Sequence, residues 1–249
     1  MAREALIGRT FVELADTLVD DYDVIDFLHT LAERCVSLLE VAEAGVVLAD
    51  RQGNLRPVAS SSERMRLLEL IELQRADGPC LDCWRDGRPV RADDLAEEAG
   101  RWPRFAPAAL DGGFRSVYAL PLRLREERIG ALNLFSEKPA GLSEEDQQLG
   151  QALADVATIG ILHERFVRGR ETFTDQLQAA LNSRVVLEQA KGIVAEQAGV
   201  DMDGAFGLLR NHARNNNRRL GEVATDVIER RLSASQLSAV SSRSTRRPG

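Results

Sequence analysis

Two pairs of short apolar runs constrain the fold of this chain more than any other feature. Residues 45–49 and 55–59 flank a polar turn that contains Gly53, and residues 116–122 and 128–135 flank a second polar turn. Apolar runs of this length, separated by a few turn-forming residues, are typical of β-hairpins. Helical patterns lie before, between and after the two pairs. The order predicts an antiparallel sheet with helices on one side, an α+β fold.

The segments around the first hairpin are helical or irregular. Large apolar residues recur at three- and four-residue steps over 6–42, and the acidic run 20–23 marks a turn and a new helix start. Residues 62–75 predict another helix, with these inward residues: Met65, Leu68, Ile71 and Leu73. The segment 76–114 holds four of the eight prolines. It predicts loops, short helices and an edge strand near Val90 that fold over one face of the sheet.

A long helical pattern follows the second hairpin. Ser143 and Asp146 form a start that resembles a capping box, and no proline interrupts the pattern from 144 to 181. Such a length is typical of a coiled-coil connector. Gly160 and Gly169 predict a kink or a break within it.

Three short helices are predicted within residues 182–232. The first begins at 182–183 and ends at Gly199, which suits a left-handed C-terminal cap. Asp201 can cap the second helix, and the third covers 220–232. Three short helices joined by tight turns predict a compact bundle with little room for a cofactor.

The charge of the chain is divided unevenly. Residues 165–249 contain 14 Lys and Arg and 9 Asp and Glu, a net charge of +5, which leaves −12 on the first 164 residues. This division predicts two units with different partners. The basic end is the candidate for binding a polyanion.

Basic residues recur on the polar faces of the last helices. Arg210, Arg214 and Arg218 repeat at steps of four, a spacing that predicts one stripe. Guanidinium groups bind phosphates bidentately and stack on unpaired bases, and asparagines bond base edges. A solvated helix face is the alternative explanation. The candidate nucleic-acid-binding residues are Arg184, Lys191, Arg210, Arg214, Asn217 and Arg218.

Cysteines and aromatic residues mark a second candidate site. Cys80 and Cys83 have the spacing of a redox pair or of half a zinc site, but the chain offers no second such pair and its three histidines are scattered. We therefore predict no metal, and packing of the two thiols in the core is the favoured alternative. The candidate ligand-pocket residues are Cys83, Trp84, Trp102, Phe105 and Tyr118, which would equally suit an aromatic core.

Several classes of protein are disfavoured. The sequence has no phosphate-binding loop, no G-x-S-x-G and no H-E-x-x-H, so we expect no enzyme and no cofactor. The longest stretch without Asp, Glu, Lys or Arg is 11 residues, too short for a membrane helix. The first residues lack the apolar core of a secretory signal, and three cysteines are too few for a disulfide scaffold. These features predict a cytoplasmic protein.

The C-terminal helices resemble the ANTAR domain, a family of RNA-binding transcription antitermination regulators. The resembling blocks are Arg184–Val194, Ala205–Arg210, Ala213 and Leu220–Ile228. The resemblance implies a three-helix domain that recognises paired hairpin loops in leader transcripts, and it gives Lys191 particular importance. Gly204 departs from the family, which often has an acidic residue there, and this puts the strength of the second helix start in doubt.

Residues 23–165 resemble a GAF domain, a frequent partner of ANTAR. The resembling stretches are Gly78–Trp84, Gly113–Val117, Pro121–Leu122 and Ile129–Phe135. The resemblance implies an α+β sensor with a pocket between the sheet and the irregular segment. The asparagine-lysine-phenylalanine-aspartate-glutamate pattern of cyclic-nucleotide-binding members is not evident, so we assign no such nucleotide.

These inferences give one functional hypothesis. It is a cytoplasmic, signal-dependent antiterminator that dimerises through its long helices, senses an unknown small molecule and binds RNA with two hairpin loops. The alternatives are a protein-interaction sensor module without RNA binding and a thiol redox switch at Cys80 and Cys83. The expected parts are an N-terminal helix (1–22), the sensor (23–165), the overlapping connector and dimerisation helix (144–181), the RNA-binding bundle (182–232) and a disordered tail (233–249).

Overall fold

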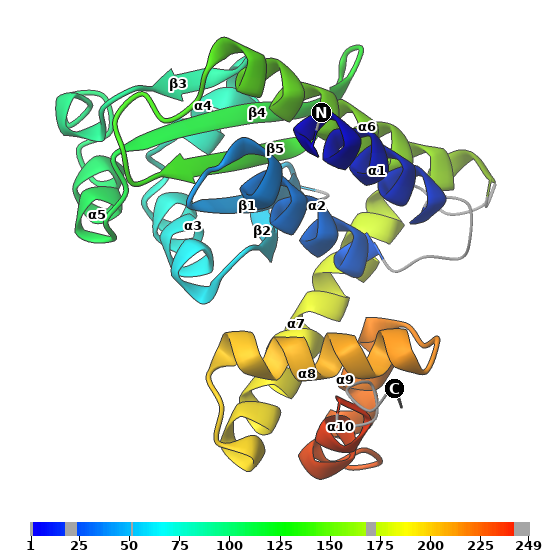
Figure 1. Ribbon diagram of the computed structural model, residues 1–249. Helices are drawn as coiled ribbons and strands as arrows, with labels where there is room; N and C mark the ends of the chain where they lie inside the picture. Colours follow the sequence, from blue (N-terminus) through cyan, green and yellow to red (C-terminus); the bar gives the residue numbers. More distant parts are fainter. Residues whose placement is uncertain (1, 18–23, 51, 168–172, 242–249) are drawn as a thin grey trace. The chain divides into compact units, whose positions relative to one another are not determined.

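The computed structural model describes residues 2–17, 24–50, 52–167 and 173–241. Its contacts divide the chain into two compact units (Figure 1). The first contains most of the chain up to residue 178, and the second contains residues 179–249 together with 22–26. We describe each unit by itself.

The first unit is built on a five-stranded antiparallel sheet. Its strands are β1 (Glu43–Ala49), β2 (Leu55–Ser60), β3 (Val90–Ala92), β4 (Ser116–Leu124) and β5 (Glu127–Ser136). The order across the sheet is β2-β1-β5-β4-β3 (Figure 1). The two predicted hairpins are therefore confirmed, and so is the predicted edge strand, since β3 pairs only with β4.

Helices cover both faces of this sheet. They are α1 (Ala2–Thr17), α2 (Val24–Leu39), α3 (Glu63–Arg75), α4 (Pro79–Asp86), the 3-10 helix η1 (Leu95–Glu97), α5 (Phe105–Asp111) and α6 (Glu144–Val167). On one face, Val117 and Ala119 of β4 pack in a cluster with residues of α3, α4 and α5. On the other face, Leu120 and Leu134 lie against Gly150 of α6.

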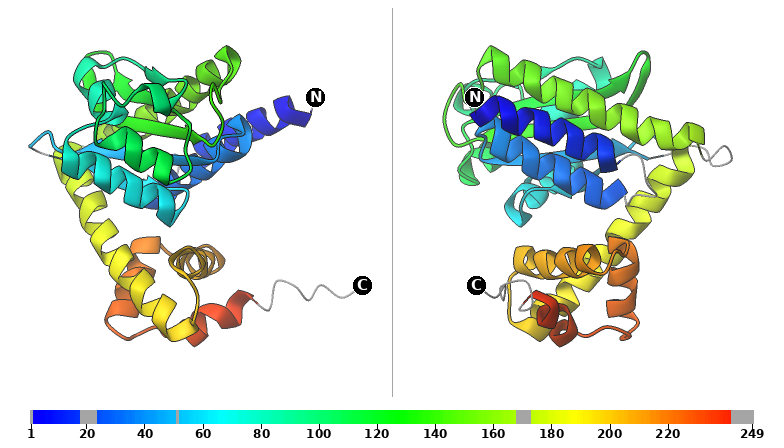
Figure 2. Two further views of the ribbon diagram at one scale, coloured as in Figure 1. Left: turned by 90° about the vertical axis from the view of Figure 1, so that its left-hand side faces the viewer. Right: turned by 45° about the vertical axis from the view of Figure 1, so that its right-hand side comes forward.

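The expectation of helices on one side was wrong because the central strands are apolar on both faces. Seven consecutive residues of β4 and eight of β5 are buried. Uninterrupted burial of this kind requires a covering layer on each side of the sheet. Figure 2 shows α1, α2 and α6 side by side as one of these layers.

The helix α3 also differs from its expected orientation. Met65 and Leu68 are buried as predicted, but Ile71 is 38% exposed. Glu69 and Glu72 are buried instead. Neither acidic residue was among those predicted to lie inward, and charged side chains are rarely buried without a partner.

In its described residues the second unit contains most of α7 (Phe173–Ala198) together with α8 (Met202–Asn215), α9 (Leu220–Ile228) and α10 (Ala234–Ser241). Helix α7 runs through residues 182–183, so the predicted helix start there is wrong. Gly199 follows α7 with a φ of +65°, and Asp201 caps α8 by accepting a hydrogen bond from Gly204 N. The glycine at 204 therefore leaves the cap of α8 in place.

Two expected boundaries fall outside the described residues. Helix α2 begins at Val24, just after the acidic run 20–23. Helix α6 is described up to Val167 and α7 from Phe173, so the break predicted near Gly169 lies outside the described residues.

The segment predicted as a disordered tail, 233–249, contains a helix in its described part. Ala234 and Leu237 of α10 are buried, and α10 packs against α8. The serine-rich composition misled the prediction, because two apolar residues three positions apart are enough to dock one face of a short helix. Helix α9 ends at Ile228 rather than at 232, and Arg230 follows with a φ of +59°.

Candidate nucleic-acid interface and sensor core

Two of the predicted nucleic-acid-binding residues are packed inside the second unit. Lys191 and Arg210 are each only 6% exposed. The Lys191 Nζ and the Arg210 Cζ atoms lie 6.0 and 5.9 Å from the centre of the Phe206 ring. Lys191 Nζ also donates to Glu188 Oε1 at 3.1 Å. Their long aliphatic stems and their cation–π contacts make them part of the helix packing.

Arg210 and Arg214 share one acidic partner. Arg210 Nε donates to Asp26 Oδ1 at 2.7 Å, and Arg214 Nη2 lies 3.6 Å from Asp26 Oδ2. Asp26 belongs to the same compact unit. The two arginines differ in access, because the Arg210 side chain is 8% exposed and the Arg214 side chain is 50% exposed. Arg214 is thus the accessible member of the pair.

The predicted arginine stripe does not continue along one helix. Helix α8 ends at Asn215, and Asn217 has a φ of +49°, so Arg218 lies in the turn that follows. Arg218 Nη2 donates to Asp226 Oδ2 at 2.7 Å. That hydrogen bond and a second one from Arg231 lower the pKa of the Asp226 carboxyl. The ion pairs fix the turn between α8 and α9.

The exposed polar residues gather at the end of α8 and in this turn. Arg214, Asn215 and Asn217 are exposed, Arg218 is partly exposed, and Arg219 is exposed as well. Asn215 and Arg219 do not fall on the stripe predicted at steps of four, and they were not among the candidate residues. The sixth predicted residue, Arg184, is half-buried on α7.

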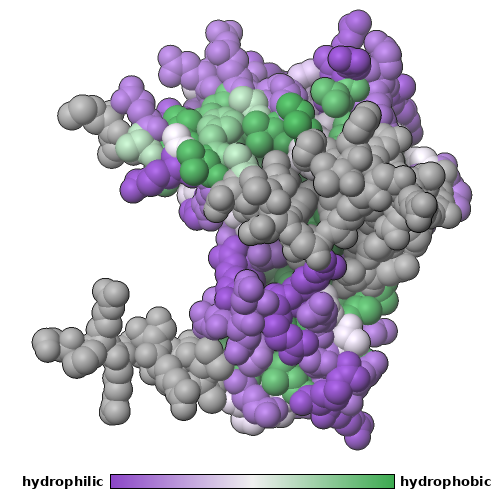
Figure 3. Space-filling view, turned by 90° about the vertical axis from the view of Figure 1, so that its right-hand side faces the viewer, coloured by the Kyte–Doolittle hydropathy of each residue, from purple (hydrophilic) through white to green (hydrophobic). Residues whose placement is uncertain are grey.

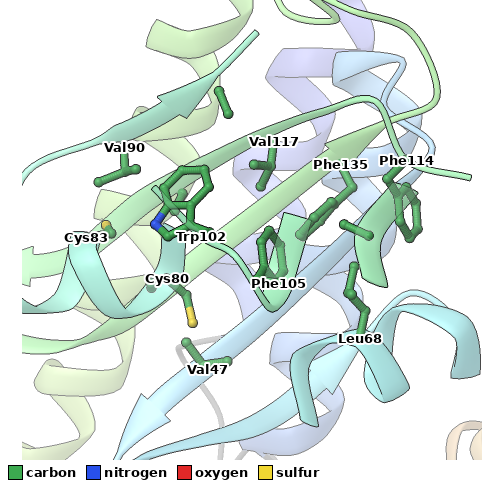
Figure 4. Close-up of a cluster of buried hydrophobic side chains, with 14 of the residues drawn as sticks. Val47, Leu68, Cys80, Cys83, Val90, Trp102, Phe105, Phe114, Val117 and Phe135 are labelled. Carbon is green, nitrogen blue, oxygen red and sulfur yellow. The ribbon is translucent and has the colours of Figure 1, made fainter. Parts of the chain in front are cut away.

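Four of the five predicted pocket residues come together in the sensor core. Figure 4 shows Cys83, Trp102 and Phe105 within a cluster of buried side chains, and Trp84 packs partly buried against it. The Trp102 and Phe105 rings meet edge to face with centroids 6.1 Å apart. Trp102 Nε1 donates to Asp82 Oδ2 at 3.0 Å, which satisfies the buried indole.

The fifth predicted pocket residue lies on the opposite face of the sheet. Tyr118 stands between Val117 and Ala119, which both point into the cluster, and neighbouring strand residues alternate between faces. Its hydroxyl donates to Asp93 Oδ1 at 2.7 Å. Tyr118 therefore does not line a common pocket with the other four residues.

The thiols of Cys80 and Cys83 are protected from reaction. Both side chains have no exposed surface, and both cysteines are free. Burial and, after it, the nearby Glu72 carboxyl raise the pKa of Cys83 to about 12 and that of Cys80 well above its ordinary value. Because the thiolate is the reactive form, this environment favours the packing role of the thiols over a redox switch.

A shallow polar cavity of about 400 Å³ lies elsewhere in the first unit. It is lined by residues of α1, of the α2–β1 connection, of the segment after β5 and of α6, including Arg3, Glu40, Lys138 and Asp146. Arg3 and Asp146 form an ion pair with each other across it. No motif in the sequence pointed to this cavity.

Neither a metal site nor a membrane span is evident in the described parts of the chain. No group of three or more His, Cys, Asp or Glu side chains there is placed to hold a metal ion. None of the helices in those parts is both long and apolar enough to pass through a bilayer.

Solved structures similar to this chain include several GAF domains. The GAF domain of the Acinetobacter phosphoenolpyruvate-protein phosphotransferase matches with a TM-score of 0.52 and 14% identity, over 67% of this chain and 96% of that one. The GAF domain of the corresponding protein from Coxiella burnetii matches with a TM-score of 0.50 and 14% identity, over 66% of this chain and 96% of that one. Free methionine-R-sulfoxide reductase from Neisseria meningitidis, solved with its substrate, matches with a TM-score of 0.52 and 19% identity. The match covers 66% of this chain and 91% of that one. These similarities establish the fold of the first unit.

No curated protein matches the chain. Family models, however, confirm the resemblance to both the ANTAR domain and the GAF domain. The ANTAR domain model matches residues 175–228, and the GAF domain model matches residues 21–162, which is more than half of the 249 residues. The chain therefore belongs to the GAF domain family and carries an ANTAR domain in its C-terminal part.

Proposed function

We propose that this protein is a signal-dependent transcription antiterminator whose ANTAR domain binds paired hairpin loops in a leader RNA. GAF and ANTAR are regulatory domains, and their presence in one chain supports a signal-sensing, RNA-binding regulator in general. Binding would favour the antiterminated arrangement of the transcript over the terminator. The observation that carries the proposal is the exposed basic segment Arg214–Arg219, which we call the α8–α9 segment.

The α8–α9 segment has the chemistry that RNA loops require. Arg214 offers a guanidinium group that is half exposed, and Asn215 and Asn217 offer exposed amides. Guanidinium planes stack on unpaired bases and bind phosphates, and amides bond base edges. The 3.6 Å pair between Arg214 and Asp26 is partly exposed, and such pairs are weak enough for a phosphate to replace. Lys191 and Arg210, by contrast, would act by holding the helices in place.

Dimerisation through the helices α1 and α6 completes the proposal. Val12 of α1 is 69% exposed and Ile159 of α6 is 51% exposed. Figure 3 shows apolar side chains gathered on this side of the first unit. A second copy would cover these side chains, and two ANTAR domains would match two hairpins. A signal would act by binding one dimer arrangement more tightly than another, in the cytoplasm where transcripts form.

Electrophoretic binding assays test the proposal. The full-length protein is titrated against an RNA with two hairpins and against a scrambled RNA, at several salt concentrations. We expect preference for the hairpin pair and an affinity that falls steeply with salt. Arg214→Ala should weaken binding several-fold and reduce the salt slope by about one. Arg123→Ala, which removes an exposed arginine of β4, is the matched control and should bind like the wild type.

Two results would contradict the proposal. Equal affinity for both RNAs, or an affinity that does not depend on salt, would leave the protein-interaction module as the better explanation. Undiminished binding by Arg214→Ala would remove the α8–α9 segment from the interface.

A further inference from the structure

The first unit buries two carboxyl groups beside each other beneath its sheet. Glu69 and Glu72 lie three residues apart on α3, and neither has any exposed surface. Glu69 Oε2 accepts a hydrogen bond from Ser60 Oγ at 2.9 Å, and its Oε1 accepts one from Asn133 Nδ2 at 3.2 Å. Glu72 Oε1 accepts one from Cys80 N at 2.7 Å. Elements β2, β5 and α4 therefore all position this pair.

Two glycines make room for the carboxyl groups. A Cβ atom at Gly45 would lie 2.3 Å from Glu69 Oε1, and one at Gly78 would lie 2.4 Å from Glu72 Oε1. Gly78 also has a φ of +153°, which residues with side chains rarely adopt. Any other residue at either position would displace a carboxyl group, so both acids are built into the fold.

Two buried oxygen atoms at this place lack hydrogen-bond donors. Glu72 Oε2 and Asn133 Oδ1 have no hydrogen-bond partner among the residues that the structure describes. Both belong to side chains with no exposed surface, and a buried acceptor without a donor is costly. Because Asn133 Nδ2 bonds Glu69, its amide oxygen lies at the same cluster.

The surrounding groups add negative potential. Burial, together with the smaller effects of the Glu69 and Asp82 carboxylates, raises the pKa of Glu72 to about 8, although its hydrogen bonds to Cys80 act to lower it. On α4, the Glu72 carboxyl raises the pKa values of Cys80 and Cys83, and Asp86 adds to the rise at Cys83. A group with positive charge and N–H donors would satisfy the acceptors and balance the charge together.

We propose that Glu69, Glu72 and Asn133 form a site for a small ligand with an ammonium or guanidinium group, and that this ligand is the signal of the GAF domain. The inference rests on the sensing role proposed above and is independent of RNA binding. Because neither carboxyl group is exposed, binding requires a local opening of the helices that cover the pair. Near neutral pH the bound cation replaces the proton of the Glu72 carboxyl, and that proton passes to solvent.

Proton release distinguishes this site from a nonspecific ion effect. The full-length protein is titrated calorimetrically near neutral pH with methylammonium, guanidinium or tetramethylammonium at matched ionic strength, in two buffers that differ in ionisation enthalpy. We expect the two cations with N–H donors to release up to about one proton per chain and to raise the Tm in the order of their affinity. Tetramethylammonium carries the same charge but has no N–H donors, so it should neither release a proton nor raise the Tm.

Two variants locate the effect. Glu72→Gln keeps the shape of the protonated carboxyl group, so it should fold and should lose the proton release and the rise in Tm. Glu63→Gln, in the first turn of the same helix, is the matched control and should keep both. No response of the wild type to either donor cation, an equal response to tetramethylammonium, or an unchanged response of Glu72→Gln would each overturn the proposal.

The RNA assay separates this inference from the proposed function. A protein that prefers paired hairpins but shows no cation-linked proton release overturns only the ligand assignment. A protein that releases the proton but does not bind hairpin RNA keeps the cation site and overturns the antiterminator.

Discussion

A single buried carboxyl group makes the free energy of unfolding of the first unit depend on pH. The pKa of Glu72 is about 8 in the folded protein, against an ordinary value of 4.5. Between these values the folded state keeps a proton that the unfolded state has lost, so the free energy of unfolding falls as the pH rises. We expect Glu72→Gln to remove this fall and Glu63→Gln to keep it.

Tryptophan fluorescence can follow this effect in one unit alone. Both tryptophans of the chain, Trp84 and Trp102, lie in the first unit. Urea unfolding monitored by their emission between about pH 5 and pH 8 measures the slope. A wild-type slope that matches that of Glu72→Gln would show that Glu72 does not hold its proton in the folded state.

Residues that depart from a pattern were the hardest to predict. Residues 116–122 form an uninterrupted apolar run, so the sequence does not show which of them share a face, and Tyr118 was grouped with residues of the opposite face. Glu69 and Glu72 were not among the residues predicted to lie inward, since nothing local shows that Gly45 and Gly78 leave room for them. Such burial depends on contacts between distant segments, which periodicity does not record.

At the scale of elements, the packing of helix α10 predicts how much stability the second unit loses when one buried leucine is truncated. Leu237 is 1% exposed and lies in the helix that packs against α8. Truncating a buried leucine typically costs about 2–5 kcal/mol. We expect Leu237→Ala to destabilise the second unit by an amount in the lower part of this range, because α10 is short.

Circular dichroism during thermal unfolding measures this loss. Ser235→Ala changes an exposed residue of the same helix and should leave the transition unchanged. If Leu237→Ala also left it unchanged, α10 would not stabilise the packing of α8.

Elements with local signals were predicted well, and elements whose ends depend on packing were not. The hairpins needed only neighbouring apolar runs and their turns, and all four strands follow those runs closely. Residues 182–183 looked like a helix start because Asn and Ser favour that position, but α7 continues through them. The serine-rich composition of 233–249 likewise gave no sign of α10, which packs against α8.

For the whole molecule, the exposed apolar side chains predict how two copies associate. Val12→Asp and Ile159→Asp place a charge on the surface proposed for dimerisation, so we expect a shift toward monomer in sedimentation velocity experiments. Leu124→Asp, at a position that is 41% exposed on β4, is the control and should not change the oligomeric state. A wild type that sediments as a monomer at micromolar concentration would contradict the dimer.

The two margins of the sheet decide which surfaces remain for self-association. At one margin β3 has only three residues, and at the other β2 contains Pro57, which lacks a backbone donor. A short outer strand and a proline both discourage the addition of further strands. Both margins therefore disfavour fibril-like stacking, which agrees with the proposal that two copies associate through their helices.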